Sequence, residues 1–213
     1  KDVIIDKESF AKGYDAPTWP TGFLQGRHGS FFEWNHQTYF AYCDISQTGN
    51  RYFRDTFISY VHYKENGEIA KIRVDGVGVG QYNLKDSKVI EAEDYFKAAG
   101  VVKKQIKNNF VVVTDAQKSF LNYPNINQIK SYKKVILELL APKGGQFSIE
   151  IRLNSLKGKK IAEKTFNLKE GLVNFENLEI ELTSALKNKE NLYFLIEQKE
   201  QTHLQINSFS FSK

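Results

Sequence analysis

The chain has 213 residues, of which 41% are hydrophobic and 26% are charged, and it carries a net charge of +5. These proportions are ordinary for a folded globular protein, so disorder is not the default expectation, and the length favours two domains of modest size. The sequence has no apolar run of about 18 residues, which excludes a membrane-spanning helix, and its single Cys43 excludes a disulfide framework and a cysteine-rich zinc site.

Four predicted strands follow one another in the first part of the chain. The aromatic-rich runs 30–34 and 38–43 predict a hairpin. Residues 56–63 and 69–74 predict a second hairpin, closed by the strong turn signal Asn66-Gly67. Four short strands in a row are the composition of one propeller blade.

This four-stranded sheet is predicted to be apolar on both faces, because successive side chains of a strand point in opposite directions. Phe31 is adjacent to Phe32, and Tyr39 is adjacent to Phe40. A lone sheet with two apolar faces exposes too much apolar surface to be stable. We therefore expect it to have neighbours: missing propeller blades, the second part of the chain, or copies of the same chain.

Eight short strand candidates, separated by turn residues, fill the second part and predict a β-sandwich of jelly-roll type. In the run from Phe147 to Leu153, apolar and polar residues alternate, which predicts one face in a core. Aromatic residues occupy 16 of the first 86 positions and 13 of the remaining 127. This shift predicts two domains, 1–86 and 87–213, in an all-β protein. The eight candidates are residues 88–93, 110–114, 133–140, 146–153, 160–168, 172–180, 191–198 and 204–211.

The positive charge is concentrated in the second part, with a net charge of −1 over residues 1–86 and +6 over residues 87–213. Such an excess attracts nucleic acid or acidic polysaccharide. The lysines, however, alternate with apolar residues along predicted strands, which is typical of solvated sheet faces, and no nucleic-acid recognition motif accompanies them. We therefore predict neither a nucleic-acid partner nor a membrane partner.

The run Gln25-Gly26-Arg27-His28-Gly29-Ser30-Phe31-Phe32-Glu33-Trp34 resembles the start of the fifth blade of family 43 glycoside hydrolases. The resemblance continues through residues 37–44 and 50–63. It implies that His28 helps to hold a metal ion or water beneath the active site, and that Arg54 lies near the substrate pocket. Without the resemblance, His28 is interpreted as a hydrogen-bonded loop residue and Arg54 as a solvated edge-strand charge.

The resemblance implies that this chain holds no catalytic residue. Family 43 enzymes invert the anomeric centre with two carboxyl groups that stand about 6.5–9.5 Å apart. In the family these carboxylates lie on the first three blades, ahead of the matched region, and neither Glu33 nor Asp44 matches a catalytic position. The parent therefore resembles an inverting glycosidase, whereas we expect this chain alone to be inactive.

The opening run Val89-Ile90-Glu91-Ala92-Glu93-Asp94-Tyr95 and the closing run from Leu204 to Phe209 resemble a family 6 carbohydrate-binding module. Such modules stack sugar rings on aromatic side chains and bond the hydroxyls with a few polar groups. The resemblance places Tyr123 at the stacking position and Gln205 where an asparagine bonds sugar hydroxyls. A second aromatic is replaced at Gly171-Leu172, so a structural sandwich with a degenerate cleft stays an alternative.

The same resemblance implies a structural calcium ion held by Glu91 and Glu93, since paired carboxylates are suitable oxygen ligands. Where the family commonly adds an acid to this site, the chain has Asn207. The alternative is an ordinary surface pair of acids.

Taken together, the resemblances predict the carboxy-terminal part of a polysaccharide-degrading hydrolase that acts on arabinan- or xylan-type glycans. They also imply a secreted, periplasmic or cell-surface location, although no signal peptide opens the sequence. A stand-alone carbohydrate-binding protein and a purely structural module are the two alternatives.

Overall fold

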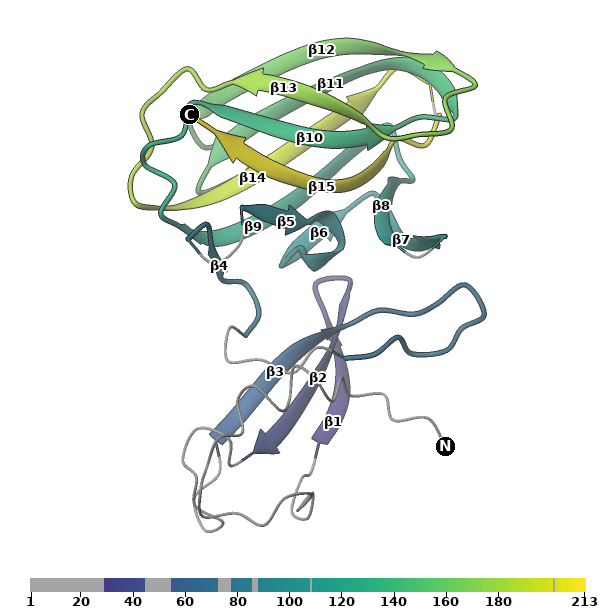
Figure 1. The fold of residues 1–213 in the computed structure, drawn as a ribbon, viewed down its shortest axis with the longest axis vertical. Coiled ribbons are helices and arrows are strands. Elements are labelled where there is room, and N and C mark those ends of the chain that lie inside the picture. Colours follow the sequence, from purple (N-terminus) through teal and green to yellow (C-terminus); the bar gives the residue numbers. More distant parts are fainter. Residues whose placement is uncertain (1–28, 45–54, 73–77, 86–87, 108, 201) are drawn as a thin grey trace. The chain divides into compact units, whose positions relative to one another are not determined.

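The structure is a computed structural model that describes residues 29–44, 55–72, 78–85, 88–107, 109–200 and 202–213. The chain divides into two compact units, Lys1–Val79 (unit 1) and Gly80–Lys213 (unit 2). In the described residues, the regular structure consists of strands and one short 3₁₀ helix (Figure 1). The predicted all-β class is confirmed. Within the same residues, no helix has the length and apolar character needed to cross a membrane.

The described part of unit 1 is an antiparallel sheet in the order β1-β2-β3, formed by β1 (Gly29–Trp34), β2 (Gln37–Asp44) and β3 (Asp55–Val61). The tight turn between β1 and β2 has two residues with positive φ angles, as right-twisted hairpins require. The sheet therefore has three described strands where the sequence predicted four. Of the fourth, Ile69 forms an isolated bridge with Tyr63, and residues 73–74 lie outside the described residues.

Aromatic side chains line both faces of the unit 1 sheet, as the sequence predicted. On one face the ring centroids of Phe31 and Phe40 lie 4.8 Å apart, and on the other those of Phe32 and Tyr39 lie 5.2 Å apart. Tyr39 is buried, but every residue of β1 is exposed. The edge strand of the described sheet thus presents apolar side chains on both of its faces.

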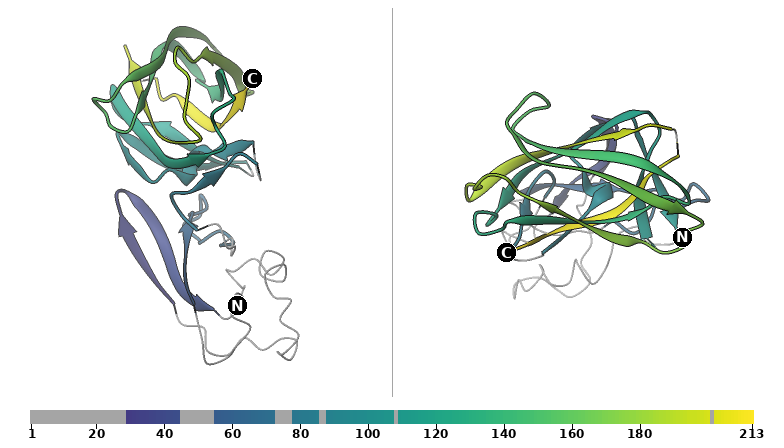
Figure 2. Two further views of the ribbon diagram at one scale, coloured as in Figure 1. Left: turned by 90° about the vertical axis from the view of Figure 1, so that its left-hand side faces the viewer. Right: turned by 90° about the horizontal axis from the view of Figure 1, so that it is seen from above.

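Unit 2 is a sandwich of two six-stranded sheets, which lie face to face in the views of Figures 1 and 2. The first sheet has the order β13-β10-β15-β8-β7, with β5 also paired to β15; the second has the order β12-β11-β14-β9-β4, with β6 also paired to β9. The first consists of β5 (Val89–Glu91), β7 (Val101–Ile106), β8 (Asn109–Thr114), β10 (Lys134–Leu140), β13 (Glu176–Glu181) and β15 (Gln205–Ser212). The second consists of β4 (Tyr82–Asn83), β6 (Lys97–Ala99), β9 (Lys118–Asn127), β11 (Lys143–Leu153), β12 (Lys160–Glu170) and β14 (Lys189–Gln198).

Unit 2 begins before residue 86, the boundary predicted from the change in aromatic content. Tyr82 and Asn83 form β4, which pairs in parallel with Ile126 and Asn127 of β9. Leu84 is buried in the sandwich core. These contacts attach the polar stretch around residue 82 to the sandwich, which a composition count does not detect.

The sandwich core is built by the alternation that the sequence predicted on β11. Phe147, Ile149 and Ile151 are all buried, and the residues between them point outward. The strand β9 was not predicted, because Pro124 and several asparagines interrupt its apolar pattern. The proline is tolerated because it lies at an irregularity in the register of β9 and β14.

Tyr123, the predicted sugar-stacking residue, belongs to this core, so that prediction is wrong. Its side chain is 1% exposed, and its hydroxyl donates a hydrogen bond of 2.7 Å to the carbonyl oxygen of Ala92. The Tyr123 ring packs edge-on against Phe194 and Phe209, with the centroids 5.7 Å and 4.6 Å away. A ring enclosed in this way cannot offer a face to a sugar.

We expect substitutions of Tyr123 to lower stability rather than sugar binding. Tyr123→Phe leaves the buried Ala92 carbonyl without its donor and should lower the free energy of unfolding by about 1–3 kcal/mol. Tyr123→Ala also opens a cavity and should cost about 3–5 kcal/mol. Urea denaturation followed by fluorescence measures both values. A Tyr123→Ala protein of unchanged stability that no longer binds glycans would restore the stacking role.

Candidate functional site

The predicted functional residues that the structure describes do not come together in one place. His28 and Arg54 lie outside the described residues, so their roles stay predictions. Tyr123 lies in the core of the sandwich. Gln205 and the pair Glu91 and Glu93 lie on or beside the first sheet, and each requires its own description.

Gln205 begins β15 and pairs with Leu140 of β10. Its Oε1 atom is buried and has no hydrogen-bond partner among the described residues. The nearby chain turns at Gly171, whose amide donates to the carbonyl of Pro142 just beyond β10. The next residues are Leu172, which is half-buried, and Val173, which is 77% exposed. Neither has an aromatic face, so these two described residues do not supply the second stacking surface that the family has at this position.

Glu91 and Glu93 lie in different environments. Glu91 is exposed at the end of β5, whereas Glu93 is buried in the 3₁₀ helix η1 (Ala92–Asp94). Burial raises the pKa of Glu93 to about 8, and the neighbouring Asp94 adds to the effect. Lys103 of β7 places a positive charge close to Glu93 and Asp94, and burial lowers the pKa of Lys103 to about 8. The Lys103 ammonium also lies 6.0 Å from the centroid of the Tyr95 ring.

The side chain at the third position of the implied calcium site faces a carboxylate instead of offering an oxygen to a cation. Asn207 donates from Nδ2 to Glu138 Oε2 at 2.6 Å, and Ser208 donates from Oγ to the same oxygen at 3.0 Å. The Asn207 Oδ1 atom accepts a hydrogen bond from Asn109 at 3.5 Å. Among the described residues, no group of three or more His, Cys, Asp or Glu side chains is arranged to hold a metal ion. The side chains at the implied ligand positions therefore do not fit the calcium site that the family has.

A groove of about 390 Å³ lies on the outer face of the second sheet, and we refer to it below as the sheet groove. Its volume is in the range of sites that bind small ligands. Four strands contribute to it, and the hairpin loop between β11 and β12 contributes Leu156. Its lining residues include Lys118 and Phe120 from β9, Leu195 and Glu197 from β14, Ser148 and Glu150 from β11, and Glu163 from β12.

The register of the sheet places these residues in rows that cross the strands. Phe120 is paired with Leu195, Leu195 with Glu150, and Glu150 with Glu163. Cross-strand partners in a sheet point to the same face. Because neighbouring strands lie about 4.8 Å apart, the row extends for about 14 Å from β9 to β12. The sheet groove is therefore long enough for more than one sugar ring.

Two half-buried aromatic rings stand at the β9 and β14 side of this face. The centroids of Phe120 and Tyr193 lie 6.3 Å apart, and the rings are tilted by 36°. Both point away from the core, since Leu121 and Phe194, their neighbours in sequence, are buried inside it. The outer face thus offers the aromatic surface that the turn at Gly171 does not supply.

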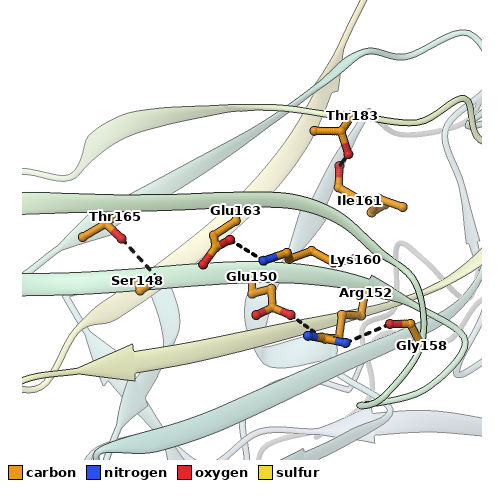
Figure 3. Close-up of polar contacts among 9 residues, drawn as sticks. All are labelled: Ser148, Glu150, Arg152, Gly158, Lys160, Ile161, Glu163, Thr165 and Thr183. Carbon is orange, nitrogen blue, oxygen red and sulfur yellow. Dashed lines mark hydrogen bonds and ion pairs between the residues drawn. The ribbon is translucent and has the colours of Figure 1, made fainter.

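Ion pairs lie on the same sheet face as the aromatic pair, and each carboxylate of the sheet groove has a cationic partner. Glu150 is paired with Arg152, and Glu163 with Lys160 (Figure 3). Lys118 and Glu197 form a third pair at 3.2 Å. A further bond runs from Thr165 Oγ1 to Ser148 Oγ at 3.4 Å. The sheet groove therefore combines apolar carbon with fixed donors and acceptors at nearly balanced charge.

The sequence predicted none of these residues as functional. The alternation on β11 did indicate that Ser148, Glu150 and Arg152 point outward. Phe120 was missed because its strand was not recognised. Recognising Phe120 as a site residue requires knowing that β9 pairs with β14, and this pairing is visible only in the structure.

We expect unit 2 to be stable without calcium. The melting temperature should differ by less than about 1 °C between a calcium buffer and a buffer with EGTA, because a ligand stabilises a protein only where it binds the native state. Asn207→Asp should lower the melting temperature in EGTA, since it removes a donor and sets a second carboxylate against Glu138. Differential scanning calorimetry measures both effects. Stabilisation of the unaltered protein by several degrees on adding calcium would contradict this expectation.

Comparison with solved structures finds a similar fold in a family 43 arabinoxylan arabinofuranohydrolase from Bacillus subtilis, solved in complex with cellotetraose. The identity is 16% and the TM-score is 0.54. The similarity covers 88% of this chain but 41% of that enzyme, so the chain spans less than half of its length. No family model and no curated protein matches the sequence.

Family 6 carbohydrate-binding modules match a shorter part of the chain over nearly their whole length. The Clostridium stercorarium module in complex with cellobiose is 14% identical, with a TM-score of 0.54 and coverage of 62% of this chain and 97% of that one. The Clostridium cellulolyticum module in complex with xylose is 21% identical, with a TM-score of 0.51 and coverage of 59% and 96%. A β-1,3-glucan-binding module from Bacillus halodurans is 14% identical, with a TM-score of 0.52 and coverage of 62% and 99%. The chain thus contains a β-sandwich with the fold of these modules.

Proposed function

We propose that unit 2 is a carbohydrate-binding module and that it binds a short stretch of glycan in the sheet groove. The observation that carries the proposal is the pair of outward aromatic rings, Phe120 and Tyr193, beside three ion pairs on one sheet face. Sugar rings have apolar C–H faces and polar hydroxyl edges, so they require both kinds of surface together.

The aromatic part of the sheet groove supplies the stacking surface. Phe120 is paired with Leu195, so apolar carbon continues from β9 to β14. Leu156 adds a further exposed apolar side chain from the loop. Aromatic anchors of this kind dominate binding energy because they bury large area with few rotatable bonds.

The polar part of the sheet groove supplies hydrogen bonds to hydroxyls. A carboxylate has about four acceptor sites, so a carboxylate in an ion pair keeps several of them available. Glu150 is 21% exposed, so it stays accessible, and its ion pair with Arg152 helps to fix its position. Their mutual pairing balances the local charge and favours uncharged glycans.

The bound sugars of the similar structures support a saccharide partner. The module from Clostridium stercorarium was solved with cellobiose, and that from Clostridium cellulolyticum with xylose. The Bacillus halodurans module binds β-1,3-glucan. These are properties of those proteins, and for this chain we propose a neutral polysaccharide or oligosaccharide.

Phe120→Ala is expected to weaken glycan binding by about 2 kcal/mol, or roughly thirtyfold in Kd, because the aromatic ring that lines the sheet groove is lost. Affinity gel electrophoresis with arabinoxylan, β-1,3-glucan and hydroxyethyl cellulose measures the retardation. Trp34→Ala is the matched control, since it removes an exposed aromatic ring of unit 1. We expect it to migrate as the unaltered protein does.

Two outcomes would contradict the proposal. Equal retardation of Phe120→Ala and the unaltered protein would place the sugar site elsewhere on unit 2. Absence of retardation in every glycan tested would favour the purely structural module.

A second candidate function concerns the whole chain: the carboxy-terminal part of a secreted, periplasmic or cell-surface hydrolase acting on arabinan- or xylan-type glycans. One specific observation favours it, because the family 43 enzyme from Bacillus subtilis is similar in fold over 88% of this chain. The exposed aromatic edge of β1 is also consistent with a sheet that packs against preceding blades.

If this second function is correct, the chain contributes the sugar-binding module and the last propeller blade of the hydrolase. The catalytic carboxylates then lie on other blades of that hydrolase. We therefore expect no turnover of aryl arabinofuranosides or aryl xylosides by this chain, measured as released nitrophenol against a heat-denatured sample. Turnover that persists after purification to homogeneity would show that the chain holds its own acid and base.

A further inference from the structure

We infer that Arg152 is a positioning residue of the sheet groove, and that it acts through the loop that carries Leu156. This inference rests on the proposed sugar site, because it concerns the shape of that site. It starts from the short connection between β11 and β12, residues 154–159, which we call the hairpin loop.

Backbone hydrogen bonds close the hairpin loop at its base and within it. The Leu153 amide donates to the Lys159 carbonyl at 3.0 Å, and the Gly158 amide donates to the Ser155 carbonyl at 3.0 Å. A Cβ atom added to Gly158 would lie 1.7 Å from the Leu153 carbonyl oxygen. Glycine is therefore required there, and the loop packs its backbone tightly against the end of β11.

Leu156 is the part of the hairpin loop that reaches the sheet groove. It is 41% exposed and lines the sheet groove together with Phe120 and Leu195. A sugar in the sheet groove would therefore contact apolar carbon from the loop as well as from the sheet. The position of the loop then decides how closely that carbon approaches the ring.

Arg152 joins the sheet groove to the hairpin loop. Its guanidinium forms an ion pair with Glu150, a lining residue, and donates from Nη1 to the Gly158 carbonyl at 3.0 Å (Figure 3). The register of β11 and β12 shifts between Ile151 and Arg152, and such irregularities redirect side chains. The Arg152 guanidinium thus links Glu150 on the sheet face to the backbone of the hairpin loop.

Arginine suits this task better than lysine. A guanidinium offers five donors in a rigid fork, so two partners in different directions are bound at once. A lysine ammonium is a flexible point charge and holds one of the two partners well. We therefore expect Arg152→Lys to behave more like Arg152→Ala than like the unaltered protein.

A double-mutant cycle in a binding assay tests whether Arg152 acts through Leu156. Leu156→Ala and Arg152→Ala should each weaken binding of the tightest neutral glycan by about fivefold to tenfold, as expected for one lost contact of about 1 kcal/mol. The double variant should bind about as weakly as either single variant. If the affinity of the double variant falls by the product of the two factors measured for the single variants, the inference is overturned. Arg152 would then contact the sugar independently of Leu156.

Limited proteolysis gives a readout that does not depend on sugar. Lys157 and Lys159 are exposed in the hairpin loop and are sites for trypsin. Arg152→Ala should speed cleavage there several-fold, while the melting temperature and circular dichroism show that the sandwich remains folded. Lys134→Ala is the control, since it removes a cation with two ion pairs on the other sheet and should leave the cleavage rate unchanged.

The two readouts separate failure of the inference from failure of the proposed function. Absence of glycan binding in the unaltered protein, with faster loop cleavage in Arg152→Ala, would reject the sugar site and keep the link between Arg152 and the loop. Unchanged loop cleavage in Arg152→Ala would reject the link, whatever the protein binds.

Discussion

The burial of one face of each sheet is the constraint on which the structure of unit 2 depends. Phe209 of the first sheet lies 4.6 Å from Tyr123 and 4.8 Å from Phe194 of the second, measured between ring centroids. These rings join the two sheets at their centre. Because side chains alternate along a strand, each strand that buries every second residue presents the others outward. Most residues that line the sheet groove are those outward residues, so one pattern produces both the core and most of the site.

Unit 1 follows the opposite pattern, with aromatic residues on both faces of its described sheet. Its aromatic pairs, Phe31 with Phe40 and Phe32 with Tyr39, form between neighbouring strands of the same sheet and leave β1 exposed. Cross-strand aromatic contacts stabilise a sheet by about 0.2–1 kcal/mol each, which does not replace a second layer. Tyr39, Tyr42 and Tyr60 are buried, so the exposed apolar surface of the described sheet is concentrated on β1, and a further layer covering β1 stays a prediction.

The sequence predicted the all-β class and the β-sandwich, since these follow from local alternation and turns, but it predicted the site poorly. The family resemblance placed Tyr123 at the stacking position, and nothing in the sequence shows whether a tyrosine ring there is buried or exposed. The burial of Tyr123 is decided by Phe209, 86 positions later in the chain, which no local pattern shows. In the same way, Phe120 and Glu150 become neighbours only through Leu195. Residues that meet across three strands leave no signal at a fixed sequence spacing.

The sandwich has two places where a sugar could be held, and the side chains favour the sheet face over the end. At the end, Leu172 and Val173 have no aromatic face, and the Oε1 atom of Gln205 is buried. On the face, rings and charged groups lie on the same side of the sheet, and the Glu150–Arg152 pair is the least exposed of the three ion pairs, at 21% and 26%. Binding loses less conformational entropy when the contacting side chains are already ordered. The Glu150–Arg152 pair therefore contributes by holding the Glu150 carboxylate in place, whereas the more exposed pairs, such as Lys118–Glu197, order their side chains little.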